Sequence, residues 1–371
     1  MKEKKAGRII ILIAFVVIIC LSNVIRLFAG KIVDTTSREN RTPAKKPEMT
    51  ADSYGTFSSD YTSYYNDNLP FRNNLITLNS AIDYFCFGRP SSDHVAIGTD
   101  NWLFYTKKDD GDPIGCYQGT NLFTEDQLNA ITQNCMEMRD LIESQGKEFV
   151  ILIVPNKERI YSEYMPERYG KPADNYGALQ IYDHLKTNTD LRVIYPYDEL
   201  MAAKEQVSEN IWYKTDTHWN MIGAYAGASS LMKELGIEMP SLNSNTVTIK
   251  TGEETSGDLA DMLSLHKQLL FADRQYTVEG YDMHDLKCSG KGFDNMINYH
   301  ATGADPRSIY IIRDSFATQM ADYIGSQFSD TFLRYAASYS YDELLRCDPD
   351  IVVYETAERY ADRLRRFSIQ Q

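Results

Sequence analysis

An aspartate and a histidine stand two positions apart near the middle of this chain, where residues 215–220 read TDTHWN. In an extended segment, residues two positions apart point to the same side. The Asp216 carboxylate can then fix the tautomer of the His218 imidazole and stabilise its protonated form, which a general-base histidine needs. The pair therefore predicts a base, and the nucleophile must come from elsewhere in the chain.

The best candidate nucleophile lies far downstream. An apolar, β-branched run over 309–312 stops near Asp314-Ser315, and a helix-like segment follows. A hydroxyl at a strand-to-helix turn is exposed at the edge of the sheet, and the free N–H groups of the helix can hold an oxyanion. We therefore predict that Ser315, His218 and Asp216 form an acyl-transfer site. Each of the two motifs alone also has a structural explanation. The D-x-H pair can be a structural hydrogen bond, and Asp and Ser are preferred helix N-cap residues.

Composition narrows the class of protein. The chain has 371 residues, of which 43% are hydrophobic and 24% charged, as expected of one large globular unit with attachments. Its net charge of −14 disfavours nucleic acid as a partner. The six cysteines form no C-x-x-C pair and the six histidines no H-x-H or H-E-x-x-H motif. We therefore expect no metal site and no cofactor. The cysteines leave one or two disulfides open outside the membrane but do not imply a disulfide framework.

The N-terminal segment has the pattern of a membrane anchor. Residues 1–8 carry four bases and one acid, and an apolar run follows over 9–29. About twenty apolar residues cross a bilayer, and the basic flank stays in the cytosol. We predict a cytoplasmic tail at 1–8, an uncleaved signal anchor at 9–29, a polar tether at 30–56 and an extracytoplasmic domain at 57–371. A cleaved signal peptide is the alternative.

Helix and strand patterns alternate through the predicted domain. A capping-box signature at 124–127 opens a helix, and the continuous apolar run 149–154 that follows is typical of a strand buried on both faces. Further strand patterns occur at 192–195, 309–312, 331–335 and 351–354, and further helix patterns at 57–65, 71–85, 175–187, 221–235, 317–324, 341–345 and 358–366. This alternation predicts an α/β fold with a mostly parallel sheet covered by helices on both faces.

Two segments depart from the alternation. Residues 96–105 place a Thr-Asp-Asn turn between apolar runs, which predicts a β-hairpin. Residues 240–300 are polar and rich in glycine, and they fit neither the helix nor the strand pattern well. We expect this second segment to be a long insertion or flap near the site.

The order of several short motifs resembles a known family. The residues Asp216-x-His218-Trp219-Asn220, followed by Asp314-Ser315-Phe316, are similar to those of the SGNH-hydrolase-like proteins that O-acetylate exopolysaccharides. These are the alginate acetylation group and its DHHW-type relatives. Supporting pieces lie at 39–41, 68–72, 97–105, 154–157 and 349–359. The likeness extends from about residue 39 to the end, and its specificity comes from the joint order of the pieces.

The resemblance implies a flavodoxin-like α/β/α sandwich with a Ser–His–Asp triad. It makes Ser315 the nucleophile, His218 the base and Asp216 the residue that orients the base. The chain departs from the family pattern at two positions. Arg313 stands in the place of a glycine before Asp-Ser, and Thr217 replaces the first His of the D-H-H-W form.

Weaker site assignments follow from the same resemblance. Asn156 is a candidate oxyanion donor, Arg359 a candidate contact for an anionic sugar, and Trp219 a candidate substrate contact. An Asn in a turn, an Arg in a charged helix and a packed Trp are the corresponding structural interpretations.

The implied activity is transfer of an acetyl group to a polysaccharide acceptor outside the membrane, with an integral-membrane O-acyltransferase relaying the acetyl group outward. Two alternatives stay open. One is a carbohydrate acetylesterase with the same three residues, because the sequence does not report whether water is excluded. The other is a non-catalytic glycan-binding or assembly scaffold of the same fold. This alternative stays open because Arg313, next to Asp-Ser, replaces the glycine of the family pattern.

Overall fold

The computed structural model of the chain describes residues 11–13, 15–17, 43–69, 71–291 and 296–370. The predicted tail, most of the predicted anchor and residues 30–42 of the predicted tether lie outside this set. Within the part of the chain that is described, no helix is both long enough and apolar enough to cross a bilayer. The anchor at 9–29 stays a prediction.

The chain divides into two compact units. The smaller contains the residues up to 92 and 260–268, and the larger contains 93–259 and 269–371. The smaller unit carries two helices, α2 (Phe57–Asp67) and α3 (Arg72–Phe87), close to the predicted bounds. The unit that carries the sheet therefore begins at residue 93, whereas the sequence pattern predicted a single domain that begins at 57.

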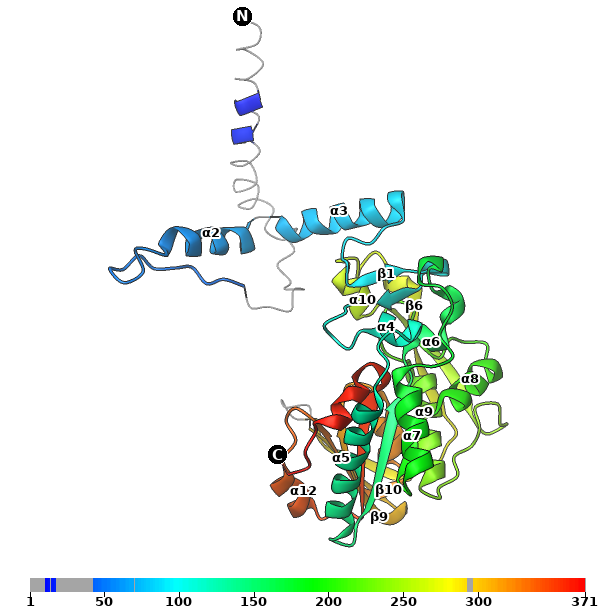
Figure 1. Ribbon diagram of the computed structural model, residues 1–371. Helices are drawn as coiled ribbons and strands as arrows, with labels where there is room; N and C mark the ends of the chain where they lie inside the picture. Colours follow the sequence, from blue (N-terminus) through cyan, green and yellow to red (C-terminus); the bar gives the residue numbers. More distant parts are fainter. Residues whose placement is uncertain (1–10, 14, 18–42, 70, 292–295, 371) are drawn as a thin grey trace, which may run out of the picture. The chain divides into compact units, whose positions relative to one another are not determined.

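A seven-stranded mixed sheet forms the centre of the larger unit (Figure 1). Its strands, in spatial order, are β4 (Arg192–Ile194), β3 (Glu148–Val154), β11 (Ile351–Ala357), β9 (Asp305–Arg313), β10 (Phe328–Tyr335), β8 (Ile297–Thr302) and β7 (Asp285–Lys291). The first five run parallel, and β8 and β7 are antiparallel to their neighbours. The mostly parallel sheet expected from the sequence is thus a mixed one.

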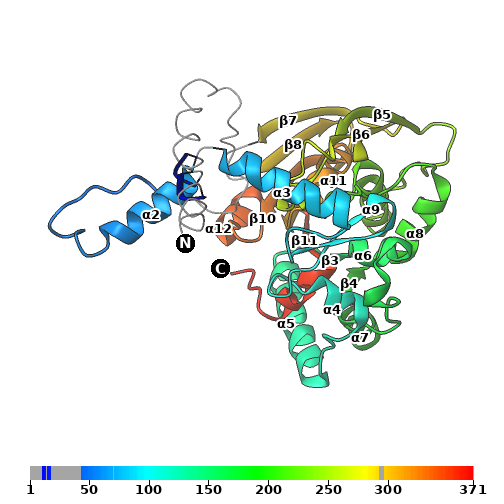
Figure 2. The same ribbon diagram turned by 90° about the horizontal axis from the view of Figure 1, so that it is seen from above.

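Helices cover both faces of this sheet. Alternate residues of β3 point to two separate hydrophobic cores, because successive side chains of a strand lie on opposite faces. One core receives side chains from α8 (Tyr197–Gln206), α9 (Met221–Glu234) and α11 (Ala317–Gly325). The other receives them from α5 (Glu125–Glu143), α7 (Gly177–Asn188), α12 (Tyr341–Cys347) and the 3₁₀ helix η5 (Glu358–Arg365). Figure 2 shows α8, α9 and α11 on one side of the strands and α5 and α12 on the other.

Local signals account for several of these elements. Thr124 caps α5 in a full capping box, and the side chains of Leu128, Ile131, Cys135, Met138 and Ile142 form its buried face, as the spacing predicts. The predicted hairpin is also present, with β1 (Val95–Ile97) paired to β2 (Leu103–Tyr105) across the 3₁₀ turn η1 (Thr99–Asn101). Short elements complete the chain: α4 (Pro113–Gln118), α6 (Lys157–Ile160), η2 (Ser162–Tyr164), η3 (Glu167–Tyr169), α10 (Asp258–Met262) and η4 (Leu270–Ala272).

The segment 240–300 is more regular than the sequence indicates. It contains a two-stranded antiparallel pair, β5 (Thr248–Thr255) with β6 (Asp273–Glu279). It then supplies β7 and the start of β8, which extend the central sheet. The interpretation as one long insertion was therefore wrong for its last part. The sequence of these strands lacks a clear apolar pattern and contains many polar residues, because β7 is an edge strand and one face of β8 is exposed.

Candidate active site

Ser315 lies in the short turn between β9 and α11. The strand ends at Arg313 and the helix begins at Ala317, so the strand–turn–helix arrangement matches the sequence pattern. Ser315 itself is partly exposed, whereas Asp314 and Phe316 on either side of it are buried. The serine thus lies at the carboxyl end of a central parallel strand, where open α/β sheets bind their ligands.

The turn is held from the neighbouring strand. Asp314 accepts hydrogen bonds from the backbone N–H of Phe316 at 2.9 Å and of Ala357 at 2.7 Å. Its own N–H donates to Glu355 Oε2 at 2.9 Å. The N-cap position of α11 is Phe316, so neither Asp314 nor Ser315 is the N-cap residue. Asp314 instead ties the serine turn to the end of β11.

Arg313, which replaces the family glycine, is turned into the protein. Its side chain is 1% exposed. Its Cζ lies 3.8 Å from the centre of the Tyr335 ring, and its Nη1 donates to the Asp314 carbonyl at 2.9 Å and to Thr318 Oγ1 at 3.0 Å. The arginine therefore braces the turn that presents the serine hydroxyl.

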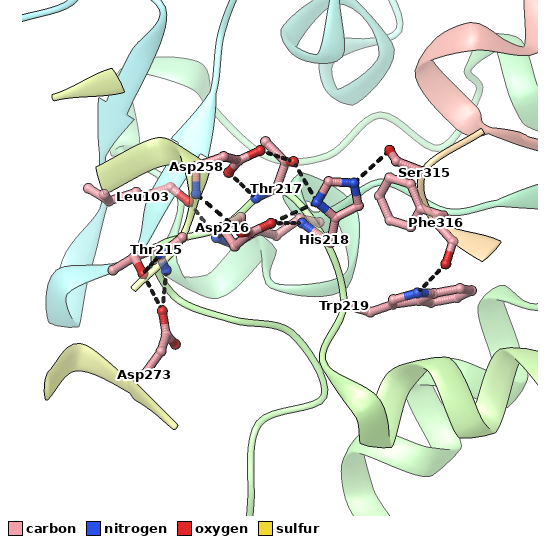
Figure 3. Close-up of polar contacts among 12 residues, drawn as sticks. Leu103, Thr215, Asp216, Thr217, His218, Trp219, Asp258, Asp273, Ser315 and Phe316 are labelled. Atoms are coloured by element: carbon pink, nitrogen blue, oxygen red, sulfur yellow. Dashed lines mark hydrogen bonds and ion pairs between the residues drawn. The ribbon is translucent and has the colours of Figure 1, made fainter. Parts of the chain in front are cut away.

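The structure brings the three predicted side chains together across 97 residues (Figure 3). His218 Nε2 lies 2.7 Å from Ser315 Oγ, and His218 Nδ1 lies 2.7 Å from Asp216 Oδ1. Asp216 Oδ1 also accepts the backbone N–H of His218 at 2.9 Å. In the tautomer with the proton on Nδ1, the imidazole donates to the carboxylate and accepts from the serine hydroxyl. The serine proton then has a base within direct reach.

Burial and charge favour the charged form of the Asp216–His218 pair. Burial lowers the pKa of the His218 imidazole, but the hydrogen bond to Asp216 and its charge outweigh burial, so the pKa is raised above its ordinary value. Burial likewise raises the pKa of Asp216, and the hydrogen bonds from His218 lower it below its ordinary value. The site therefore stabilises the imidazolium that forms when serine loses its proton.

The candidate oxyanion donor Asn156 follows β3 at the same edge of the sheet. It is 1% exposed, its backbone N–H donates to Glu358 Oε2 at 3.0 Å, and its Oδ1 accepts from the Arg359 N–H at 3.4 Å. Among the described residues, its Nδ2 has no hydrogen-bond partner. An amide donor without an acceptor is consistent with the predicted role, which stays a prediction.

Arg359 lies beside the serine turn. Its Cζ is 5.3 Å from the centre of the Phe316 ring and 4.9 Å from that of Tyr360. Its Nε is buried and lacks a hydrogen-bond partner within the described part of the chain. Its charge is close enough to oppose the rise in the pKa of His218. The structure therefore places a cation next to the site, where the sequence analysis expected a contact for an anionic sugar.

Trp219 packs in the core, and its assignment as a substrate contact was wrong. The side chain is 0% exposed, so no sugar can stack on it. Its Nε1 donates to the Phe316 carbonyl at 3.0 Å. The ring lies against Gly227 of α9, where a Cβ would approach it to 2.6 Å. Trp219 thus joins the histidine segment to the serine turn.

The buried lysine of the 154–157 motif has a role that was not predicted from the sequence. Lys157 is 1% exposed, and its Nζ donates to the carbonyls of Leu103, Lys214 and Asp216 at 2.6, 2.9 and 2.9 Å. Burial lowers its pKa to about 8 against the opposing effect of nearby carboxylates. A buried ammonium with three carbonyl acceptors fixes the backbone just before the histidine.

Two aspartates from the segment 240–300 also hold this backbone. Asp273 accepts from the N–H of Lys214 at 2.5 Å, from the N–H of Thr215 at 2.7 Å and from the Thr215 hydroxyl. Asp258 accepts from the N–H and hydroxyl of Thr217 at 2.8 and 2.6 Å. The only sequence signal for them was the expectation that this segment lies near the site.

Asp216, His218 and Asp258 also offer three ligand atoms within 4.8 Å of one another. Both ring nitrogens of His218, however, already lie at hydrogen-bonding distance from Asp216 and Ser315. The arrangement fits a hydrogen-bonded relay, and we assign no metal to it.

Comparisons with known proteins identify the family of the chain. The model of the family described as SGNH hydrolase-like domain, acetyltransferase AlgX, matches residues 95–291, more than half of the chain. The matched range contains Asp216 and His218 and ends before Ser315.

Similar proteins extend the comparison. A probable alginate O-acetylase AlgJ of Pseudomonas syringae pv. tomato is 29% identical over 220 residues, which cover 57% of this chain and 51% of that protein. The chain thus spans about half the length of that relative. The protein of the same name from Pseudomonas putida is 25% identical over 328 residues, covering 82% of this chain and 80% of that protein. A solved DHHW family protein from Eubacterium siraeum shares the fold, with a TM-score of 0.53 and 15% identity over 75% of this chain and 99% of that chain.

Proposed function

The chain belongs to the family of SGNH hydrolase-like, AlgX-type acetyltransferase domains, and we propose that it is a serine-dependent O-acetyltransferase that modifies a polysaccharide. One observation carries the proposal. The Ser315 hydroxyl, the His218 imidazole and the Asp216 carboxylate form a continuous hydrogen-bonded chain with both links at 2.7 Å. Such a chain activates a hydroxyl that is otherwise a weak nucleophile at neutral pH.

The reaction follows from these contacts in two halves. Ser315 Oγ attacks the carbonyl carbon of an acetyl donor while His218 Nε2 takes the hydroxyl proton, and Asp216 stabilises the imidazolium. The tetrahedral intermediate collapses to an acetyl-serine, and His218 returns the proton to the leaving group. A sugar hydroxyl then attacks the acetyl-serine with His218 again as base, which forms the new ester and restores the serine.

Neighbouring groups have roles consistent with this scheme. The Asn156 Nδ2 is the side-chain donor that we assign to the oxyanion of each tetrahedral intermediate. The Arg359 guanidinium beside Phe316 is the group that we assign to an anionic part of the acceptor. The two assignments predict different defects, because loss of an oxyanion donor lowers kcat, whereas loss of an acceptor contact raises KM for the glycan.

We infer the acceptor from the names of the relatives, and the acyl donor from the resemblance of the motifs to the proteins that O-acetylate exopolysaccharides. Relatives named probable alginate O-acetylase suggest a polysaccharide acceptor. An integral-membrane O-acyltransferase would supply the acetyl group, and the predicted anchor at 9–29 would hold the domain outside the membrane next to it. The net charge of −14 argues against a nucleic-acid partner.

A carbohydrate acetylesterase is the second candidate. The partial exposure of Ser315 favours it, because water can reach the acetyl-serine in the same way as a sugar hydroxyl. The two activities share the first half of the reaction and differ only in the acceptor. Product analysis with acetyl donor and glycan present separates them, since transfer yields acetylated glycan and hydrolysis yields acetate.

The test of the first half is acetyl-ester hydrolysis by the purified chain. Ser315→Ala removes the nucleophile from a partly exposed position, so folding is expected to be unchanged although His218 Nε2 loses its partner. Activity should fall by about 10⁴-fold or more, because the members of a triad act as a unit. Full activity in Ser315→Ala would rule out both candidate enzymes, whereas an inactive wild type would favour the scaffold of the same fold.

A further inference from the structure

Asp258 contacts the Asp216–His218 pair from a distant part of the chain (Figure 3). Its backbone N–H donates to Asp216 Oδ2 at 3.1 Å, while His218 occupies Asp216 Oδ1. The two oxygens of the Asp216 carboxylate are therefore held by different partners, which fixes the rotation of that carboxylate. The contact with Asp258 is not visible from the spacing of the D-x-H pair.

The Asp258 carboxylate holds the residue between the aspartate and the histidine. It accepts from the Thr217 N–H at 2.8 Å and from the Thr217 hydroxyl at 2.6 Å. Because the hydroxyl gives its proton to Asp258, the Thr217 oxygen presents a lone pair to His218 Nδ1, which lies 3.2 Å away. Nδ1–H thus points between two acceptors, Asp216 Oδ1 and Thr217 Oγ1.

The backbone before Asp258 is shaped for this contact. Residue 257 is a glycine, and a Cβ at that position would lie 2.2 Å from the Cβ of Asp216 and 2.3 Å from its Oδ2. Any larger residue would push the two segments apart. The close approach that lets the Asp258 amide reach Asp216 therefore depends on Gly257.

Charge at the site adds to this geometry. His218 is influenced by the carboxylates of Asp216 and Asp258, which raise its pKa, and by Arg359, which lowers it. Burial and the charge of Asp216 raise the pKa of Asp258, and His218 and the hydrogen bonds from Thr217 oppose that rise. A second carboxylate next to the imidazole makes its protonated form more favourable.

We propose that Asp258 is a positioning residue of the acyl-transfer site, which orients Asp216 and His218 and stabilises the imidazolium that forms when Ser315 loses its proton. This inference rests on the proposed function. It assigns Thr217, the residue that departs from the family pattern, the role of linking Asp258 to the imidazole. It also gives Asp258, which the sequence pattern left in a segment without regular structure, a part in the site.

The test compares Asp258→Asn with wild type in the hydrolysis of p-nitrophenyl acetate by the full chain. An amide in place of the carboxylate directs N–H groups at a Thr217 donor and removes one negative charge. We expect kcat/KM to fall about 10-fold to 100-fold, as for a modest misplacement of a catalytic group. In the pH profile of kcat/KM, the acid limb reports the pKa of His218 in the free enzyme. This limb should move to lower pH, because the imidazolium loses a stabilising charge.

Two further variants separate positioning from general damage to the fold. Asp285→Asn makes the same chemical change at an exposed residue that pairs with Lys287, and wild-type rate and pH profile are expected. Thr217→Val removes the hydroxyl but keeps the Asp258 carboxylate, so the rate should fall while the acid limb stays near its wild-type position. The Thr217→Val result can be interpreted even if Asp258→Asn does not fold.

The outcomes distinguish the two proposals. If Ser315→Ala remains active, the proposed function fails whatever Asp258 does. If Ser315→Ala is inactive and Asp258→Asn keeps both the wild-type rate and the wild-type acid limb, only the role of Asp258 is overturned. A folded Asp258→Asn with a lower rate and an unmoved acid limb would also overturn it, because the charge would then have no effect on His218.

Discussion

The nucleophile and the base reach the site from two regions that are built in different ways. Ser315 stands between a central strand and a helix, and Asp314 ties this turn to the adjacent strand. His218 stands in a segment, 214–219, that is neither helix nor strand apart from a single bridge between Trp212 and Trp219. Regular secondary structure positions the serine, and side chains from elsewhere in the chain position the histidine.

The supports of the histidine segment come from far away in sequence. Lys157 binds its carbonyl groups, and Asp258 and Asp273 bind its N–H groups and hydroxyls. These partners stand 41 to 59 positions from the residues that they hold. This difference predicts that the turn with Ser315 tolerates changes in single polar side chains. The segment 214–219 with His218 should instead lose its geometry when one of the side chains that hold it is removed.

The largest effect is expected for Lys157→Met on the base side. Three carbonyl oxygens would lose the Lys157 ammonium as a donor, and the free energy of unfolding should fall by about 3 kcal/mol or more. Acetyl-ester hydrolysis should fall about 100-fold at temperatures where the variant is still folded, because the backbone of Asp216 is released. Urea unfolding and initial rates measure the two effects.

Lys250→Met is the matched control, since Lys250 is 59% exposed and pairs with Glu279 at the surface. Its free energy of unfolding should stay within about 0.5 kcal/mol of wild type. If Lys157→Met kept wild-type activity, the base segment would not depend on distant side chains, and the contrast between the two regions would be lost.

A small and pH-dependent effect is expected for Glu355→Gln on the serine side. Glu355 is 1% exposed, and burial together with the charge of Asp314 raises its pKa well above the ordinary value. The folded protein therefore keeps a proton that the unfolded chain releases, so wild-type stability falls as the pH rises through the ordinary pKa of glutamate towards the raised one. Glutamine keeps an acceptor for the Asp314 N–H and does not titrate.

Urea unfolding at about pH 5 and about pH 8 tests this sign. The stability of Glu355→Gln relative to wild type should rise between the two pH values, and activity should remain close to wild type. Glu253→Gln, the same change at an exposed position, should show no such rise. Parallel stability curves for Glu355→Gln and wild type would show that Glu355 is ionised in the folded protein, contrary to this account.

The same contrast explains what the sequence could predict. The strand run 309–312 and the D-x-H pair are local patterns, and they located Ser315, His218 and Asp216 before any geometry was known. The supports Lys157, Asp258 and Asp273 act through contacts between distant segments, for which a single sequence carries no period or spacing. Trp219 was open to two interpretations, because only packing decides whether an aromatic ring faces solvent or Gly227.

The strands within 240–300 were not predicted from the sequence, for a related reason. Edge and half-exposed strands gain their pairing from the sheet that they join, and their polar residues resemble those of a loop. Strands β7 and β8 could therefore be recognised only in the structure, where they extend the parallel part of the sheet.

The most direct test of the central claim is labelling of the full chain with a fluorophosphonate, followed by mass spectrometry of the peptides. Only a serine whose hydroxyl is activated by a base reacts readily with this reagent. The account predicts one modified residue, Ser315, in the wild type, and loss of that modification in a folded His218→Ala variant. An unmodified Ser315 in folded wild type, or equal modification in His218→Ala, would contradict it.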